Sequence, residues 1–233
     1  MAFCLQLRIN MQQNISYKAN ELGEKGYYFN KVYYFQKAWK LISPYWLILS
    51  AFTALYVSFL YFALRNPDFG QIAQMIIAGP ISAGYYLTIN KIRKGEYISF
   101  GNFFDGFKMF MPVMIVSMLS GLIISIGMLL LVIPGIFFSV IYLFAMPLVV
   151  FDKLDFWAAM ESSRIIITKN FTEAFLFGLM IVGVNILGLL AFGLGVLITI
   201  PLSYAVILMA YEDIYNFEEI DEGPIKGDFS HFR

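Results

Sequence analysis

Five basic side chains are the residues of this sequence best suited to bind another molecule. Lys91, Arg93 and Lys94 directly follow a long charge-free stretch, and Lys108 and Arg164 are expected on the same side of the molecule. A basic residue near an anionic membrane leaflet contributes about 1 kcal/mol of attraction. The spacing predicts contacts with phospholipid head groups. The competing interpretation is that these cations only set the membrane topology.

Two polar side chains form a second candidate site, inside the apolar part of the sequence. Asn185 is the strongest hydrogen-bonding side chain within the apolar stretches, and Tyr204 is a milder one. In a membrane such groups form interhelical hydrogen bonds or contact a transported ligand. The first interpretation is the simpler, and the second remains open.

Residues for catalysis or metal binding are scarce. The chain has one cysteine, Cys4, and one histidine, His231, and the deep parts of its apolar stretches hold no Asp or Glu. No sequence motif for metal, nucleotide or nucleophilic chemistry occurs. We therefore expect no enzymatic activity, no cofactor and no metal site. An enzyme would require a cluster of titratable groups that the spacing does not reveal.

The elements that position these residues follow from the distribution of charge. The composition is 60% hydrophobic and 14% charged, with a mean hydropathy of +0.72, whereas a soluble domain is about a quarter charged. Four windows hold no charged residue, and a membrane span needs about 20 apolar residues. An all-α membrane protein is predicted, with six transmembrane helices at 41–64, 71–90, 110–132, 135–151, 172–192 and 194–213.

Proline and glycine mark the turns and breaks of these helices. Both longer windows contain turn residues near the middle, which divide each window into two helices. The predicted turns and helix breaks are Pro80, Pro134, Gly135, Pro147, Gly193, Gly195 and Pro201.

The orientation follows from the basic residues. All Lys and Arg residues except Arg65 fall on one side if both termini face the cytoplasm, as the positive-inside rule requires. The predicted domains are a flexible N-terminal segment (1–26), the six-helix transmembrane domain (27–214) and an acidic cytoplasmic tail (215–233). The start is expected at Met1 or Met11. The acidic stretch Glu212 to Glu222 is expected to pair with Arg164 or Lys169, or to be solvated.

An amphipathic segment precedes each predicted hairpin. Between residues 100 and 110 the phenylalanines recur at helical spacing, which is typical of a helix lying among head groups. The segments 27–40 and 155–170 are similar. The chain is thus predicted to contain three units, each with a cytoplasmic interfacial helix followed by a transmembrane hairpin.

Several of these residues together resemble a family. The runs Val132-Ile133-Pro134-Gly135-Ile136, Trp157 to Arg164 and Tyr211-Glu212-Asp213, with Gly193 to Gly195 and Pro201, are similar to uncharacterised bacterial integral membrane proteins. That family resembles the membrane domain of some glycerophosphodiester phosphodiesterases. The resemblance implies six membrane helices and brings no catalytic residues.

The sequence therefore favours a non-enzymatic, multi-pass protein of the bacterial cytoplasmic (inner) membrane. We expect an accessory subunit or a component that interacts with or organises lipid. The alternative is a transporter or permease for a small amphipathic or neutral solute. The expected partners are membrane lipids, with other proteins or a second copy of the chain as alternatives, and no nucleic acid.

Overall fold

The computed structural model describes residues 17, 19–22, 24, 27–65, 67–191 and 193–215. Every regular element in these residues is a helix, and six helical stretches are long and apolar enough to cross a membrane. The prediction of an all-α membrane protein with six such helices is confirmed. The elements are α2 Lys31–Ile42, η1 Ser43–Tyr45, α3 Trp46–Leu64, α4 Pro67–Arg93, η2 Phe100–Met109, α5 Phe110–Leu130, α6 Val132–Ile141, α7 Ala145–Phe151, α8 Phe156–Lys169, α9 Phe171–Leu190 and α10 Val196–Tyr215.

The two ends of the chain bear on the predicted domain limits. The alternative starts and the tail beyond residue 215 lie outside the described residues. The segment 1–26 was expected to be flexible, but Ala19 within it is fully buried. In addition, the Lys169 ammonium donates to the Glu24 carbonyl at 2.9 Å. At these two positions the segment is therefore docked on the rest of the protein.

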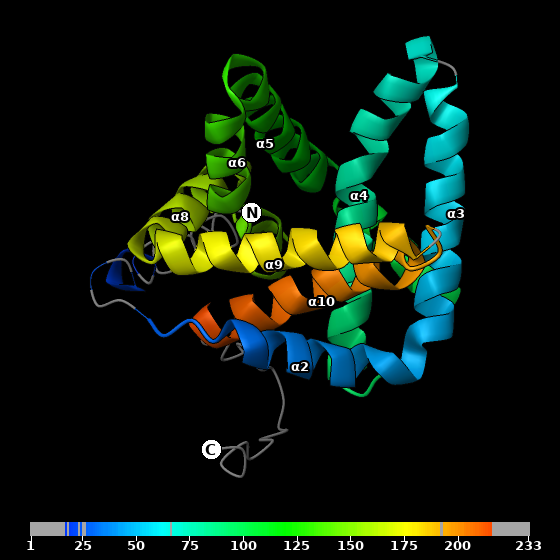
Figure 1. Cartoon of the computed structure of the whole chain (residues 1–233), viewed down its shortest axis with the longest axis horizontal. Coiled ribbons are helices and arrows are strands. Elements are labelled where there is room, and N and C mark those ends of the chain that lie inside the picture. Colours follow the sequence, from blue (N-terminus) through cyan, green and yellow to red (C-terminus); the bar gives the residue numbers. More distant parts are fainter. Residues whose placement is uncertain are drawn as a thin grey trace, which may run out of the picture.

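The six spans form three hairpins: α3 with α4, α5 with α6, and α9 with α10 (Figure 1). At the ends of the second and third hairpins, glycines bring the paired backbones together. A Cβ atom at Gly127 would lie 2.9 Å from Gly135, and one at Gly195 would lie 2.6 Å from the carbonyl oxygen of Gly188. Gly193 has a φ of +74°, which favours glycine. The predicted turn at Gly193 and Gly195 is present, whereas Gly135 lies inside α6 and the second hairpin turns at Leu131.

The prolines behave in two ways. Pro134 is the third residue of α6 and Pro147 the third of α7, in the first helical turn, where a missing N–H leaves no intrahelical bond unmade. Pro80 and Pro201 lie inside α4 and α10, which continue past them. The breaks predicted at Pro80 and Pro201 are therefore wrong. Membrane helices tolerate interior proline because neighbouring groups accommodate the freed backbone.

The fourth span is divided close to the helix break that was predicted at Pro147. α6 ends at Ile141 and α7 begins at Ala145, before Pro147. Ser163 of α8 lies against the break: its hydroxyl donates to the carbonyl of Ile141 at 2.6 Å and accepts from the amide of Phe144 at 3.2 Å. Ser163 is fully buried. Its side chain thus provides hydrogen bonds that the interrupted helix does not make for itself.

The short helices α2, η2 and α8 occupy the three positions at which interfacial helices were predicted. Each of these helices packs on the hairpin before its own. Because no hairpin comes before the first one, α2 packs on the last hairpin, which closes a cyclic order. η2 packs on α4 of the first hairpin, α8 on α6 and α7 of the second, and α2 on α10 of the third. Figure 1 shows α2 beside α10. The three short helices thus pack in a cyclic order, and three units built on the same plan stay a prediction.

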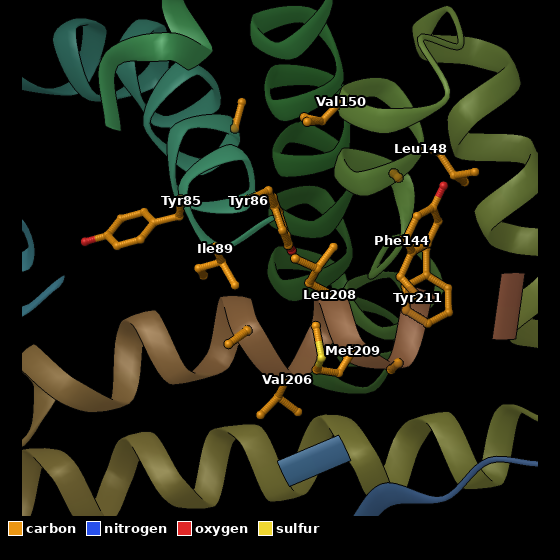
Figure 2. Close-up of a cluster of buried hydrophobic side chains, with 14 of the residues drawn as sticks. Tyr85, Tyr86, Ile89, Phe144, Leu148, Val150, Val206, Leu208, Met209 and Tyr211 are labelled. Atoms are coloured by element: carbon orange, nitrogen blue, oxygen red, sulfur yellow. The ribbon is translucent and has the colours of Figure 1, made fainter. Parts of the chain in front are cut away.

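The core lies where α4, α7 and α10 meet. Figure 2 shows buried side chains from α4, from α7 with the turn before it, and from α10 converging there. Tyr86, Leu148 and Met209 are among them, and the rings of Phe144 and Tyr211 meet edge to face at 5.8 Å. The mutual packing of the three units is thus concentrated at one end of the hairpins.

The opposite ends of the hairpins point in different directions (Figure 1). Their apolar side chains are exposed: Leu129 is 87% exposed, Ile133 79% and Leu190 73%. Exposed apolar surface on this scale is unfavourable in water and normal in hydrocarbon. The exposed surface therefore agrees with an integral membrane protein.

Candidate functional site

Nearly all the ion pairs of the described residues lie at the packed end of the hairpins, which we call the charged base. It comprises the charged residues Lys31, Lys37, Lys91, Arg93, Asp105, Lys108, Asp152, Glu161, Arg164, Glu173, Glu212 and Asp213. The cations predicted to bind lipid belong to this set, except Lys94, which is exposed at the end of α4.

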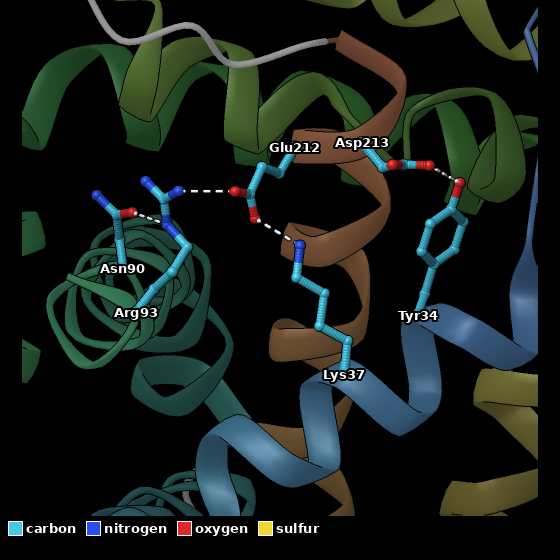
Figure 3. A network of polar contacts seen from close by, with 6 residues as sticks. All are labelled: Tyr34, Lys37, Asn90, Arg93, Glu212 and Asp213. Atoms are coloured by element: carbon cyan, nitrogen blue, oxygen red, sulfur yellow. Dashed lines mark hydrogen bonds and ion pairs between the residues drawn. The ribbon is translucent and has the colours of Figure 1, made fainter. Parts of the chain in front are cut away.

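Glu212 of α10 joins three elements (Figure 3). One carboxylate oxygen accepts from the Arg93 guanidinium of α4 at 2.7 Å, and the other lies 3.5 Å from the Lys37 ammonium of α2. Arg93 also donates to the side-chain oxygen of Asn90 at 2.9 Å. Next to this network, the hydroxyl of Tyr34 donates to Asp213 at 2.7 Å. We call the three charged residues Lys37, Arg93 and Glu212 the Glu212 clasp.

The clasp corrects two expectations. Glu212 was expected to pair with Arg164 or Lys169, but it binds Arg93 and Lys37 because α4 and α2 pack on α10. Arg93 was expected to face lipid, but its side chain is directed at Glu212 and Asn90 (Figure 3). Its charge is thus neutralised within the protein.

Asp105 of η2 is the centre of a second charge group. Its carboxylate accepts from Lys91 of α4 at 3.0 Å and lies 2.7 Å from Lys108 of the same helix. The side-chain amide of Asn102 donates to it at 3.1 Å. Asn102 also accepts from the Ser99 amide, in a capping box that begins η2. Lys91 therefore holds η2 against α4, while the side chain of Lys108 remains 80% exposed.

Phenylalanine side chains of η2 contact Phe52 of α3 and give the helix its position. Phe103 is buried and stacks on Phe52 of α3, with ring centroids 4.1 Å apart. On the outer side an aromatic strip runs from Phe104, which also contacts the buried Phe52 at 5.7 Å, to Phe107 at 6.2 Å. Phe104 and Phe107 are partly exposed. η2 is therefore anchored to the protein by one face and presents phenylalanine rings and Lys108 on the other.

Arg164 is separate from these groups. Its guanidinium donates two hydrogen bonds to Glu161, one turn earlier in α8, at 2.8 and 2.5 Å. These bonds lower the pKa of the Glu161 carboxyl, against the opposing effect of partial burial. Thus the five predicted head-group contacts do not form one cluster: Lys91 and Lys108 share Asp105, Arg93 belongs to the Glu212 clasp, and Arg164 pairs with Glu161.

The intramembrane candidates are hydrogen-bonded to neighbouring helices. Asn185 of α9 donates to the hydroxyl of Ser203 on α10 at 2.7 Å and to the carbonyl of Ile181 at 2.8 Å. The Tyr204 hydroxyl lies 2.9 Å from that of Ser82 on α4. The two side chains thus contact different neighbours and do not line a common site. These bonds favour the interpretation as interhelical contacts.

The centre of the charged base is closely packed. A hollow beneath the Arg93–Glu212 pair, between the ends of α4, α7 and α10, has a volume of about 10 Å³. Such a volume accommodates at most one water molecule. Beside it the Tyr211 hydroxyl donates to the carboxylate of Asp152, which follows α7. These contacts tie the third hairpin to the second.

Sequence reasoning missed Ser163, Lys37 and Asp213. A buried serine and a lysine in an amphipathic segment carry no spacing signal for their partners, because those partners are distant in the chain. Among the described residues, no three His, Cys, Asp or Glu side chains are grouped so that they could hold a metal ion. No family model, curated protein or solved structure matches this chain.

Proposed function

We propose that this integral membrane protein is a non-enzymatic, lipid-interacting component of the bacterial inner membrane, with its charged base in the cytoplasm. The observation that carries the proposal is the outer face of η2, where an aromatic strip lies beside the exposed Lys108. Aromatic rings favour the boundary between head groups and hydrocarbon, and lysines favour the anionic leaflet.

The arrangement of charge supports this assignment. Lys91 and Asp105 fix η2 on α4, so the helix keeps one orientation, with Phe104 and Phe107 outward. The neighbouring loop adds Lys94, which is exposed, and Tyr97, whose side chain is 90% exposed. We call the set Lys94, Tyr97, Phe104, Phe107 and Lys108 the η2 edge. It combines apolar insertion with positive charge, the two signals that together give stable contact with anionic membranes.

The test is lipid retention by the η2 edge. The double variant Lys94→Gln/Lys108→Gln keeps the Lys91–Asp105 contact and removes two charges. At about 1 kcal/mol per basic residue, each lysine contributes about fivefold to the retention of anionic lipid. Native mass spectrometry of protein released from vesicles of phosphatidylglycerol and phosphatidylethanolamine should therefore show a selective loss of phosphatidylglycerol.

The matched control is Arg65→Gln, which removes one charge at the tip of the first hairpin, where Arg65 binds the Tyr61 hydroxyl. This variant should retain anionic lipid like the unaltered protein. An unchanged lipid content in the double variant, or an equal loss in the control, would contradict the proposal.

A further inference from the structure

A hollow of about 330 Å³, open to solvent, lies between α8 and the docked part of the N-terminal segment. Three hydrogen bonds hold its walls together. The Lys169 ammonium donates to the Glu24 carbonyl at 2.9 Å, the Asn170 amide to the Tyr27 carbonyl at 2.6 Å, and the Tyr27 hydroxyl to the Ile166 carbonyl at 3.0 Å. The hollow is lined by Asn20, Glu24, Arg164, Ile165, Thr168 and Lys169.

The lining is rich in hydrogen-bond donors. Among the described lining residues, Arg164 and Lys169 are the cations, Glu24 is the acid and Asn20 adds a side-chain amide, while Arg164 also pairs with Glu161 outside the hollow. Lys169 uses one of its three ammonium hydrogens on the Glu24 carbonyl. Guanidinium and ammonium groups are the usual partners of phosphate oxygens in proteins. The donor set is therefore suited to a phosphate group.

The Arg164 guanidinium is held in one position by Glu161. Glu161, which does not line the hollow, accepts from the Nε and Nη2 atoms of Arg164. The second terminal nitrogen, Nη1, makes no part of this pair, so its hydrogens are available for another acceptor. An arginine fixed by one carboxylate loses less conformational freedom when it binds a second anion.

The same helix carries a membrane-interface signal. Trp157, at the start of α8, is 69% exposed, and tryptophan is enriched at the level of the head groups. We propose that the hollow on α8 binds a phosphate group, supplied by a phospholipid head group or by free phosphate. The lipid form of this inference rests on the proposed function, while the phosphate chemistry of the hollow does not.

The experiment uses the full chain in detergent and in lipid nanodiscs. The double variant Arg164→Gln/Lys169→Gln should lower phospholipid retention about 25-fold in native mass spectrometry, or lower the affinity for inorganic phosphate in calorimetry by a similar factor. The matched control, Lys153→Gln, removes an exposed cation just before α8 that does not line the hollow. It should change neither quantity.

The two arms identify the source of the phosphate. Loss of lipid retention assigns the hollow to a head group, and loss of inorganic phosphate binding with unchanged lipid assigns it to the free anion. The single variant Arg164→Gln leaves the Lys169–Glu24 contact in place, so the hollow should still form. Its lipid retention or phosphate affinity should fall in the same direction as in the double variant. Equal lipid retention and equal phosphate affinity in all variants would overturn the inference. If only the η2-edge variant loses lipid, the proposed function holds and the phosphate site on α8 does not.

Discussion

Ser163 donates its hydroxyl hydrogen to the carbonyl of Ile141, a residue of the preceding span, and so bonds the end of α6 to α8. The same oxygen accepts from the Phe144 amide on the other side of the break. A helix interrupted inside an apolar environment leaves backbone groups that are costly to bury without partners. One side chain thus stabilises a divided span from outside it.

Ser163→Ala should destabilise the protein by about 1–3 kcal/mol, because both backbone groups lose their partner in a buried position. Reversible unfolding in mixed micelles measures this free energy. The control is Ser139→Ala, whose hydroxyl bonds only to a carbonyl in its own helix. A cost no larger than that of the control would show that the break is stabilised by other groups.

Glu212→Gln should destabilise the protein by about 1–2 kcal/mol, since Arg93 and Lys37 then share no counter-charge in a largely buried position. Unfolding in the same micelles provides the measurement. Glu173→Gln is the comparison, because Glu173 pairs only with Lys31 among the described residues and is 46% exposed. A smaller cost is expected there, and the reverse order would mean that the clasp does not hold α4 and α2 to α10.

Gly84→Ala should cost about 1–3 kcal/mol by overpacking or displace η2 from α4. The added Cβ would lie 1.8 Å from the carbonyl oxygen of Phe103, and a backbone atom cannot rotate away as a side chain can. At Gly121 no heavy atom lies within 4 Å of the corresponding position. Gly121→Ala should therefore be tolerated, and thermal unfolding of both variants compares the two sites.

Glu161 should titrate below the usual range of a glutamate, because Arg164 donates two hydrogen bonds to its carboxylate and thereby lowers its pKa. In Arg164→Gln the titration midpoint should rise, which carbon NMR of labelled glutamate measures. A carboxyl with a lowered folded-state pKa adds stability above its unfolded pKa and loses it as the pH falls through the folded value. Any stability difference between the two proteins should therefore disappear in acid, and an unchanged midpoint would show that the pair does not persist in solution.

The proposed orientation places Lys94 in the cytoplasm and Arg65 on the opposite side. In a Cys4→Ser background, an impermeant maleimide added outside spheroplasts should label Arg65→Cys and leave Lys94→Cys unlabelled. Labelling of Lys94→Cys from outside would reverse the proposed orientation of the whole protein.

The spans were predictable because lipid excludes charge so strongly that its absence marks them. Their limits were less predictable. The window from 41 begins before Pro44, where η1 separates α2 from α3, and α4 continues through Lys91 to Arg93 because a charged residue at a helix end reaches out of the apolar region. Charge windows therefore locate spans but not the helix ends that extend beyond the membrane.

The candidate site was less predictable than the fold. The basic residues were identified, but their partners depend on the cyclic order of the hairpins, which brings α2 to α10. Periodicity describes one helix at a time and contains no information on that order. For the same reason the bond from Ser163 to Ile141 could not be expected from either segment alone.

The contact between α2 and α10 has a consequence for biosynthesis. During translation the first of these helices emerges long before the second, and its final neighbour does not yet exist. Until the last span is made, the tyrosine and lysine side chains that later meet Glu212 and Asp213 have no such acidic partners to bind. The contacts between α2 and α10 can therefore form only after the last span has been synthesised. A chain that ends before α10 would lack them.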